Sequence, residues 1–234
     1  MRPRTIAAAT AILLLAAGIA AAPAADARAP PTPICGVCEL DRTTPDDTPV
    51  VAGESALTVT LRGNGSTTWE ARVDLAAGSD ALAANESLRQ RVVSEAIQGG
   101  IAEPRGVTAR IDGDTLLVDY RDPNATDRHL GVVVFTPLTP ASPSIPFAIG
   151  GEGPRYLGAD RLTVRGESGW TVRGDASAAD ADGQLVWTRD GGGEPDDRGR
   201  VFVDVERDPV AVEVDALLPG QRAWLGRLLT SDTL

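Results

Sequence analysis

Apolar and polar residues alternate with a period of two along two stretches of the chain, which is the pattern of half-buried β-strands. Each stretch is interrupted once by glycine-containing turn residues of the kind that close a hairpin. The two predicted hairpins span residues 57–75, with Gly63-Asn64-Gly65 at the turn, and residues 107–120, with Asp112-Gly113 at the turn. On each strand the apolar residues mark the face that we expect to be buried.

A helical period separates the two hairpins. Apolar residues recur at helical spacing between Leu88 and Ile97, Asn85 is placed to cap the first turn, and Gly99-Gly100 ends the pattern. The run Val132–Phe135 is apolar throughout, as in a strand that is buried on both faces. The predicted order of this region is therefore β-β-α-β-β-β, with one amphipathic helix covering one face of the sheet.

The chain is rich in proline from residue 136 to residue 154 and β-rich after that. Short apolar segments alternate there with clusters of Gly, Asp and Pro, which is the spacing of a sandwich or an extended sheet. The candidate strands are Arg161–Arg165, Gly169–Val172, Gln184–Trp187, Val201–Val205 and Val210–Val214. The sequence thus predicts an α+β, mainly β fold in a globular domain over residues 54–216, divisible into sub-units 54–136 and 155–216.

Residues 217–234 are predicted to contain a short amphipathic helix. Between Gln221 and Leu229, helical spacing places four large apolar side chains on one side, namely Trp224, Leu225, Leu228 and Leu229. Such a face either docks onto the domain or contacts an external surface such as a membrane. After the leader described next, no apolar segment is long enough to span a membrane, so we expect no transmembrane helix in the mature chain.

The first 25 residues have the three parts of a secretory signal peptide. Arg2 and Arg4 give a basic start, Ile6–Ala22 is an apolar run with Thr10 as its one polar residue, and Ala22-Pro23-Ala24 and Ala25-Asp26-Ala27 are small-residue cleavage sites. A retained membrane anchor is the alternative, because the run reaches the roughly 20 residues that a spanning helix needs. Both interpretations predict an extracellular or cell-surface location.

Residues 26–53 are rich in Pro, Thr and Asp, have no regular apolar period, and are interpreted as a tether. They hold the only two cysteines, Cys35 and Cys38, in a CxxC spacing. Outside the cytoplasm a small local disulfide is the default for such a pair, with redox exchange, intermolecular pairing and metal binding as alternatives. Because so small a loop constrains few residues, we predict that replacing both cysteines leaves the β-rich body folded.

The charge of the chain narrows its range of partners. The formal net charge is −11, there is no Lys, and Asp outnumbers Glu 22 to 11. An excess of short carboxylates keeps a protein hydrated where salt screens charge repulsion, as in a halophilic archaeon. The alternative is a high-GC bacterium, whose codon usage also produces such a composition. Because this charge repels phosphates, nucleic acid is excluded, and a cell-envelope component or a protein is the expected partner.

The Ala-rich leader, the run from Pro33 to Glu39 with its CxxC pair, and the β-β-α-β-β order after it resemble a group of uncharacterised secreted or cell-surface proteins of halophilic archaea. That group has no assigned activity. The resemblance implies export and a location at the cell surface, and it implies no catalytic residue. Proteins of that kind often end in a C-terminal membrane helix, which we do not expect in this chain up to Leu234.

No catalytic constellation is evident in the sequence. His129 is the only histidine, so a Ser-His-Asp or Cys-His arrangement would have to use it, and no nucleophile-elbow sequence accompanies it. Asp180-Ala181-Asp182-Gly183 resembles the middle of a calcium-binding loop, but Ala178 and Arg189 would then occupy the first and last ligand positions. No metal site and no cofactor are therefore predicted, with calcium as the ion to test.

Three Asn-x-Ser/Thr sequons lie in predicted turns or at a helix start, at Asn64, Asn85 and Asn124. In a secreted chain each is a candidate glycan acceptor on a surface loop. We expect Asn64 or Asn124 to be modified before Asn85, whose side chain is predicted to cap the helix.

These features favour a secreted or cell-surface module with a non-catalytic, binding or structural role. Two alternatives stay open: an extracellular hydrolase that uses Asp or Glu carboxylates, and a protein whose CxxC pair serves redox exchange or disulfide-linked assembly. A concave pocket with two facing carboxylates would favour the hydrolase.

Overall fold

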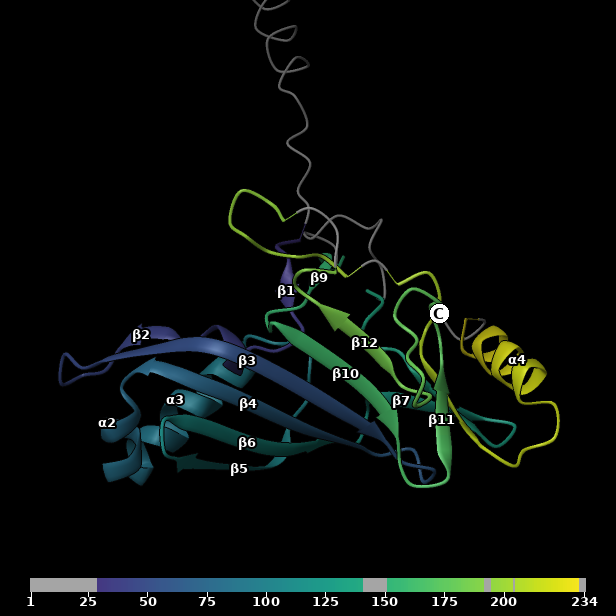
Figure 1. Cartoon of the computed structure of the whole chain (residues 1–234), viewed down its shortest axis with the longest axis horizontal. Helices are drawn as coiled ribbons and strands as arrows, with labels where there is room; N and C mark the ends of the chain where they lie inside the picture. The colour runs from purple at the N-terminus through teal and green to yellow at the C-terminus, as the bar shows by residue number, and fades with distance from the viewer. Residues whose placement is uncertain (1–28, 141–150, 192–194, 204, 232–234) are drawn as a thin grey trace, which may run out of the picture.

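The computed structural model describes residues 29–140, 151–191, 195–203 and 205–231 (Figure 1). The predicted signal peptide, residues 1–25, lies outside the described residues. The described part of the chain is dominated by strands, which form three sheets, and has few helices. This confirms the predicted fold class, α+β and mainly β.

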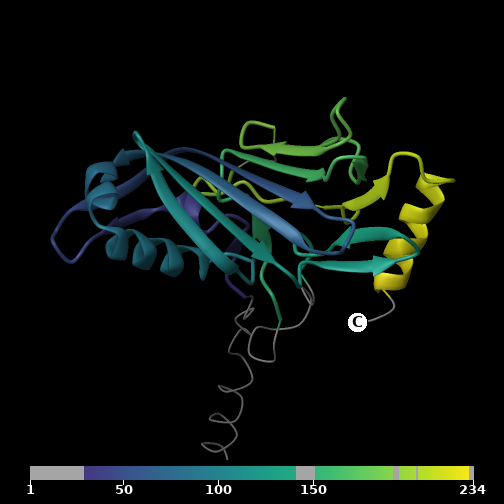
Figure 2. The ribbon, with the colours of Figure 1, turned by 90° about the horizontal axis from the view of Figure 1, so that it is seen from below.

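The largest sheet has seven strands and runs through the centre of the molecule (Figures 1 and 2). Its order is β12-β10-β3-β4-β6-β5, and β2 pairs with β3 beside this path. Both predicted hairpins are present, as β3–β4 and β5–β6. The strands are β2 (Asp41–Thr43), β3 (Pro49–Leu61), β4 (Thr67–Ala77), β5 (Arg105–Asp112), β6 (Thr115–Asp122), β10 (Arg161–Gly166) and β12 (Leu185–Thr188).

Two helices, α2 (Ser79–Ala84) and α3 (Glu86–Ile97), pack beside this sheet near β5 (Figure 2). The Asn85 side chain caps α3 by accepting a hydrogen bond of 3.0 Å from the backbone N–H of Leu88, as predicted. The apolar face expected from the helical period is buried, and it consists of Leu88, Val92, Val93, Ala96 and Ile97. The short helix α2 was not predicted.

A second sheet of four strands packs near the opposite end of the large sheet (Figure 1). Its order is β11-β13-β8-β7, with β7 (Thr126–His129), β8 (Val132–Phe135), β11 (Trp170–Arg173) and β13 (Val210–Glu213). All four residues of β8 are buried: Val133 and Phe135 belong to the main core, while Val132 and Val134 belong to a small second core. The prediction of a strand buried on both faces is confirmed.

The main core is organised around Trp69, which is fully buried on β4. Its ring stacks on Tyr120 of β6, with centroids 5.6 Å apart, and packs at a tilt against Phe135 of β8, at 5.9 Å. The indole N–H donates a hydrogen bond of 2.9 Å to Thr67 Oγ1, so the buried polar atom has a partner. Trp69 therefore joins the two larger sheets.

The second half of the chain does not form a separate sandwich. β10 pairs in parallel with β3, and β13 pairs with β8, so strands from both predicted sub-units share the same sheets and the same core. Four of the five predicted strands are present with shifted ends. The fifth, Val201–Val205, is not a strand among its described residues, since Phe202 makes only an isolated bridge to Tyr156.

The interpretation of residues 26–53 as a tether is wrong for the part that the structure describes. This segment contains β1 (Thr32–Pro33), which pairs in parallel with β9 (Arg155–Tyr156), and the 3-10 turn η1 (Val37–Glu39). Its buried side chains in the main core are Ile34, Cys35, Val37, Cys38, Leu40 and Val50. Bends and a single turn place these side chains inward without a regular period, which is why the pattern was misleading.

The predicted C-terminal helix is present as α4 (Pro219–Ser231), which packs on β8 and β13. The face in contact consists of small residues: Ala223 is buried, and a Cβ added to Gly226 would lie 2.5 Å from Val132 Cγ2. The four large apolar residues expected to share a face are all exposed, with 61 % exposure at Trp224. Among the described residues, no helix has the length and apolar character needed to cross a membrane.

Candidate functional site

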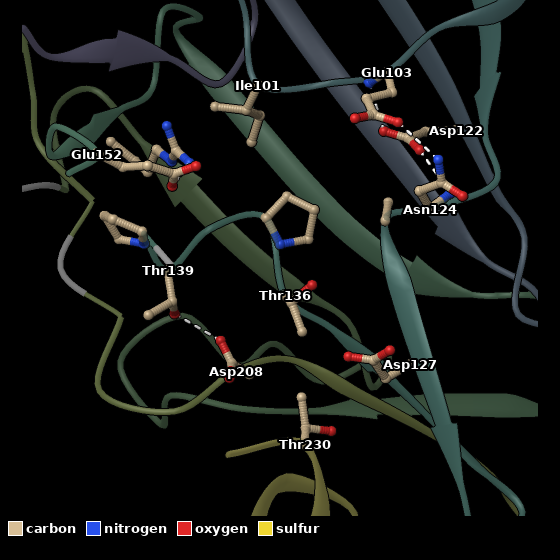
Figure 3. Close-up of a pocket in the computed structure, with 14 residues that line it drawn as sticks. Ile101, Glu103, Asp122, Asn124, Asp127, Thr136, Thr139, Glu152, Asp208 and Thr230 are labelled. Atoms are coloured by element: carbon tan, nitrogen blue, oxygen red, sulfur yellow. Dashed lines mark hydrogen bonds and ion pairs between the residues drawn. The ribbon is translucent and has the colours of Figure 1, made fainter. Parts of the chain in front are cut away.

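A cavity of about 590 Å³ with several polar side chains in its lining lies beside the four-stranded sheet (Figure 3). Its walls come from the end of β6, the start of β7, the segment after β8, the region before β9, the approach to β13 and the last turn of α4. Five carboxylates and a single cationic side chain line it. These are Glu103, Asp122, Asp127, Glu152 and Asp208, with Arg155.

One group of polar residues in the cavity holds two loops together. The carboxylate of Asp122, which is 2 % exposed, accepts hydrogen bonds from the backbone N–H groups of Glu103, at 2.7 Å, and Asn124, at 2.9 Å. The Asn124 amide in turn donates to Glu103 Oε2 at 2.7 Å. Because both Asp122 oxygens are engaged by backbone donors, this carboxylate stabilises the chain reversal after β6.

A second group lies across the cavity, as Figure 3 shows. Thr139 Oγ1 donates a hydrogen bond of 2.6 Å to Asp208 Oδ1, and the Arg227 guanidinium donates from Nε to the Asp208 carbonyl oxygen at 2.7 Å. Burial raises the pKa of Asp208, while the Thr139 hydroxyl and the charge of Arg227 act in the opposite direction. The hydrogen bond from Thr139 therefore fixes the position of the Asp208 side chain on this wall of the cavity.

The remaining charges of the cavity are spread around its walls. Arg155 pairs with Glu152 at 2.5 Å, and Asp127 lies on β7 apart from both groups (Figure 3). Within the residues that the structure describes, no three His, Cys, Asp or Glu side chains converge as they would around a metal ion. The negative charge of the lining attracts small cations. The Asp122 and Asp208 carboxylates, however, already accept hydrogen bonds from other residues of the protein.

No family model, curated protein or solved structure matches this chain. The resemblance drawn from the leader and the CxxC run therefore stays a prediction.

Cys35 and Cys38 form a disulfide, with their Cα atoms 5.4 Å apart. Both residues are buried, at 0 % and 4 % exposure, and they lie in η1 and the bend before it. Gly36 between them approaches the end of α3 so closely that a Cβ would lie within 2.3 Å of the Ala96 carbonyl oxygen. The CxxC loop therefore fits against α3, and its sulfur atoms are shielded from solvent.

The three sequon asparagines are all exposed, as glycan acceptors have to be. Asn64 lies in the β3–β4 turn, where its side-chain oxygen Oδ1 accepts hydrogen bonds from the backbone N–H and the hydroxyl of Ser66. The amide nitrogen of Asn124, where a glycan would attach, is engaged by Glu103. On this geometry we propose Asn64 as the first acceptor, and modification of Asn85 and Asn124 stays a prediction.

Two further residues that the sequence singled out have structural surroundings. His129 lies at the end of β7, where it pairs with Val132 across the hairpin. The Asp180 carboxylate accepts hydrogen bonds from the backbone N–H groups of Asp182, at 2.9 Å, and Gln184, at 3.2 Å. Asp180 therefore closes a turn by side-chain bonds to the backbone, which is a common role of Asp in loops.

Sequence reasoning missed the acidic cavity altogether. Its residues come from separate stretches between Ile101 and Thr230, and only the strand pairing brings them together. In a chain with 33 acidic residues, no single carboxylate is distinctive. The one available signal was the clustering of polar turn residues directly after β6 and β8.

The stability of the folded protein is expected to depend on pH through two carboxylates, the buried Asp175 and the partly buried Asp208. Burial raises the pKa of Asp208 and of Asp175, whose Oδ2 is buried and has no partner among the described residues. A raised pKa means that the folded state binds these protons more tightly, so stability should fall as the pH rises from 3.8 through the shifted pKa. Urea unfolding at a series of pH values measures this fall. In the Asp175→Asn, Asp208→Asn double variant, the free energy of unfolding should decrease less with rising pH than it does in the native protein.

Asp196 provides the matched control for this experiment. Hydrogen bonds from the Arg200 side chain and backbone lower the pKa of Asp196 to about 2, so its contribution is lost as the pH falls from 3.8 towards 2. Asp196→Asn should therefore change the free energy of unfolding in its dependence on pH only below about pH 3.8, where the native protein loses the contribution of Asp196. Parallel profiles for the native protein and the double variant would show that Asp175 and Asp208 are not the groups responsible.

Proposed function

We propose that this chain is an exported protein of the cell exterior or cell surface of a salt-adapted organism, with a binding or structural role rather than a catalytic one. The observation that carries the proposal is the Cys35–Cys38 disulfide, which is built into the main core. Disulfides form and persist in oxidising compartments and are rare in the cytosol. The leader of residues 1–25 and the acidic, lysine-free composition support the same location.

A non-catalytic role is supported by the way the reactive groups are used. In the acidic cavity, Asp122 holds loops through backbone donors and Asp208 is bonded to Thr139. The buried Cys35 and Cys38 offer no accessible sulfur for exchange, which requires attack by an exposed thiolate. These contacts favour binding over the two alternatives, a carboxylate hydrolase and a redox or disulfide-linked assembly protein.

Expression of the full chain in a salt-adapted secretory host tests this proposal. We expect the protein in the medium or envelope fraction, with a new N-terminus following Ala24 or Ala27 and with Cys35 and Cys38 protected from a maleimide until a reductant is added to the unfolded protein. The control is the chain without residues 1–25, which should stay inside the cell.

Salt provides a second readout on the same material. Because 33 acidic residues face 22 basic ones, self-repulsion in dilute buffer should lower the thermal midpoint, and molar sodium chloride should raise it. A protein that stays in the cytoplasm with reactive thiols would contradict export, and a midpoint independent of salt would contradict adaptation to salt.

A further inference from the structure

The exposed large apolar side chains of the described residues gather at one end of the molecule. Apart from Val107 on β5, all of them lie on α4, in the loop before it, or in the β7–β8 turn, and α4 forms that end of the molecule in both views (Figures 1 and 2). We call this set the α4 surface. It consists of Leu130, Val214, Leu217, Leu218, Trp224, Leu225, Leu228 and Leu229, with exposures between 36 % and 78 %.

The fold holds the α4 surface outward. The opposite side of the helix is anchored by Ala223 and Gly226 against the small second core, and Arg227 donates hydrogen bonds to the carbonyl oxygens of Asp208 and Arg173, at 2.7 and 2.8 Å. A helix on a protein surface normally turns its large apolar residues inward. In α4 the small residues face the protein and the large ones face away, so rotation of the helix to bury them would break the anchoring contacts.

Backbone strain marks the same surface. Leu130 and Leu218 have φ values of +53° and +54°, and with Asp47 they are the non-glycine residues at positive φ in the described chain. Leucine rarely adopts this conformation, which costs on the order of 1 kcal/mol, and such strain tends to gather at functional sites. Here the strained residues are 57 % and 65 % exposed, so the strain places leucine side chains in solvent.

The size of the α4 surface fits a protein interface. Together the eight residues, backbone included, expose a total area on the order of 800 Å², which is comparable to the total area that each partner of a standard complex buries. The largest apolar patch of a typical monomer is about 300–600 Å². The α4 surface is therefore as large as one half of a stable interface.

We infer that a second copy of this chain covers the α4 surface, with the two α4 helices packed antiparallel across a two-fold axis. Trp224, Leu225, Leu228 and Leu229 follow the spacing of a helix seam, and an identical seam provides a partner of matching shape. This inference goes beyond the proposed function by naming a partner, and it does not depend on export.

Charge favours the antiparallel arrangement. Between Pro219 and Ser231 the chain has Arg222 and Arg227 and no acidic residue. An antiparallel pair sets Arg222, in the first turn, beside the carbonyl end of the partner helix, where the helix dipole is negative. The excess of acidic over basic residues in the whole chain, which gives the full chain a net charge of −11, opposes association in dilute buffer. Salt screens this repulsion and strengthens apolar burial, so the dimer should tighten as salt is added.

Sedimentation equilibrium of the exported protein, from dilute buffer to molar sodium chloride, tests the inference. We expect a dimer in molar salt, and the variants Trp224→Glu and Leu228→Glu should weaken it about 30-fold or more, the loss expected of central interface residues. Val107→Glu is the matched control, because it introduces the same charge at an exposed apolar site away from α4. It should leave the dimer unchanged. Trp224, Leu228 and Val107 are 61, 45 and 39 % exposed, so the thermal midpoint of each variant in dilute buffer, compared with the native value, separates a loss of the dimer from a loss of folding.

The other outcomes overturn the inference. A native protein that is monomeric at every salt concentration has no partner copy, and if that monomer binds vesicles of phosphatidylglycerol, the surface is a lipid contact instead. A dimer that Trp224→Glu and Leu228→Glu leave intact uses another surface. Export and the protected cysteines are measured on the same preparation, so failure of the dimer is separable from failure of the proposed function.

Discussion

The variant in which Cys35 and Cys38 are both alanine is expected to be less stable than the native protein by about 3–4 kcal/mol. The chain-entropy model attributes about 2 kcal/mol to a disulfide that closes so short a loop. Removal of two buried sulfur atoms from the main core adds about 1–2 kcal/mol for the cavity that remains. This replaces the expectation, based on the tether interpretation, that the body would be unaffected.

Thermal and urea unfolding measure this loss, which corresponds to a fall in midpoint of roughly 10 °C for a chain of this size. Reduction of the native protein after unfolding, followed by refolding in reductant, separates the disulfide from the packing, because the sulfur atoms are then retained. If the alanine variant unfolds at the native midpoint, residues 34–40 do not contribute to the core as the structure indicates.

Replacement of Trp69 by alanine is expected to cost about 3–5 kcal/mol, the range for a fully buried aromatic residue. The substitution removes the stacking on Tyr120 and the contact with Phe135, so it weakens the junction of the two larger sheets. Given that folded domains are stable by about 5–15 kcal/mol, this variant should be close to unfolding at ambient temperature. Urea unfolding measures the change in the free energy of unfolding. It is monitored by far-ultraviolet circular dichroism, because that signal comes from the backbone and does not require Trp69.

Two further variants show whether this loss arises from burial. Trp69→Phe keeps an aromatic ring in the core but removes the hydrogen bond to Thr67 Oγ1, so its cost should be intermediate. Trp224→Ala removes the same side chain from a position that is 61 % exposed and should change stability by no more than about 0.5 kcal/mol in the monomer. Equal losses at Trp69 and Trp224 would contradict the described core.

The elements that could be predicted from the sequence are those in which burial follows a period. The β3–β4 hairpin was predictable because Leu57 and Trp69 begin regular alternations that face one core, and α3 because its buried residues recur at helical spacing after a capping Asn85. In these elements local chemistry and tertiary packing favour the same structure.

Elsewhere the outcome depends on partners that are distant in sequence. Ile34 and Cys38 are buried because α3 and β9 lie next to them, and no local pattern shows this. In α4 the large apolar residues suggested the docking face, whereas the close approach to β8 accepts only small ones. Gly226 was the available signal, since a glycine within a helix often marks a close contact. The acidic cavity has no local signal because its residues come from many segments.

The parallel pairing of β3 with β10 also bears on how the chain folds. Ser55 and Asp160, which are bonded across this pair, are separated by 105 residues, and β1 reaches β9 over a similar length of chain. Local hairpins form within microseconds, but contacts between such distant segments close slowly. A chain that emerges from an export channel with its N-terminus first would therefore hold residues 29–61 incompletely packed until β9 and β10 have followed. On the proposed export route, completion of the core is then a late step, and retention of β9 and β10 in the channel should arrest folding with Ile34 and Leu40 still exposed.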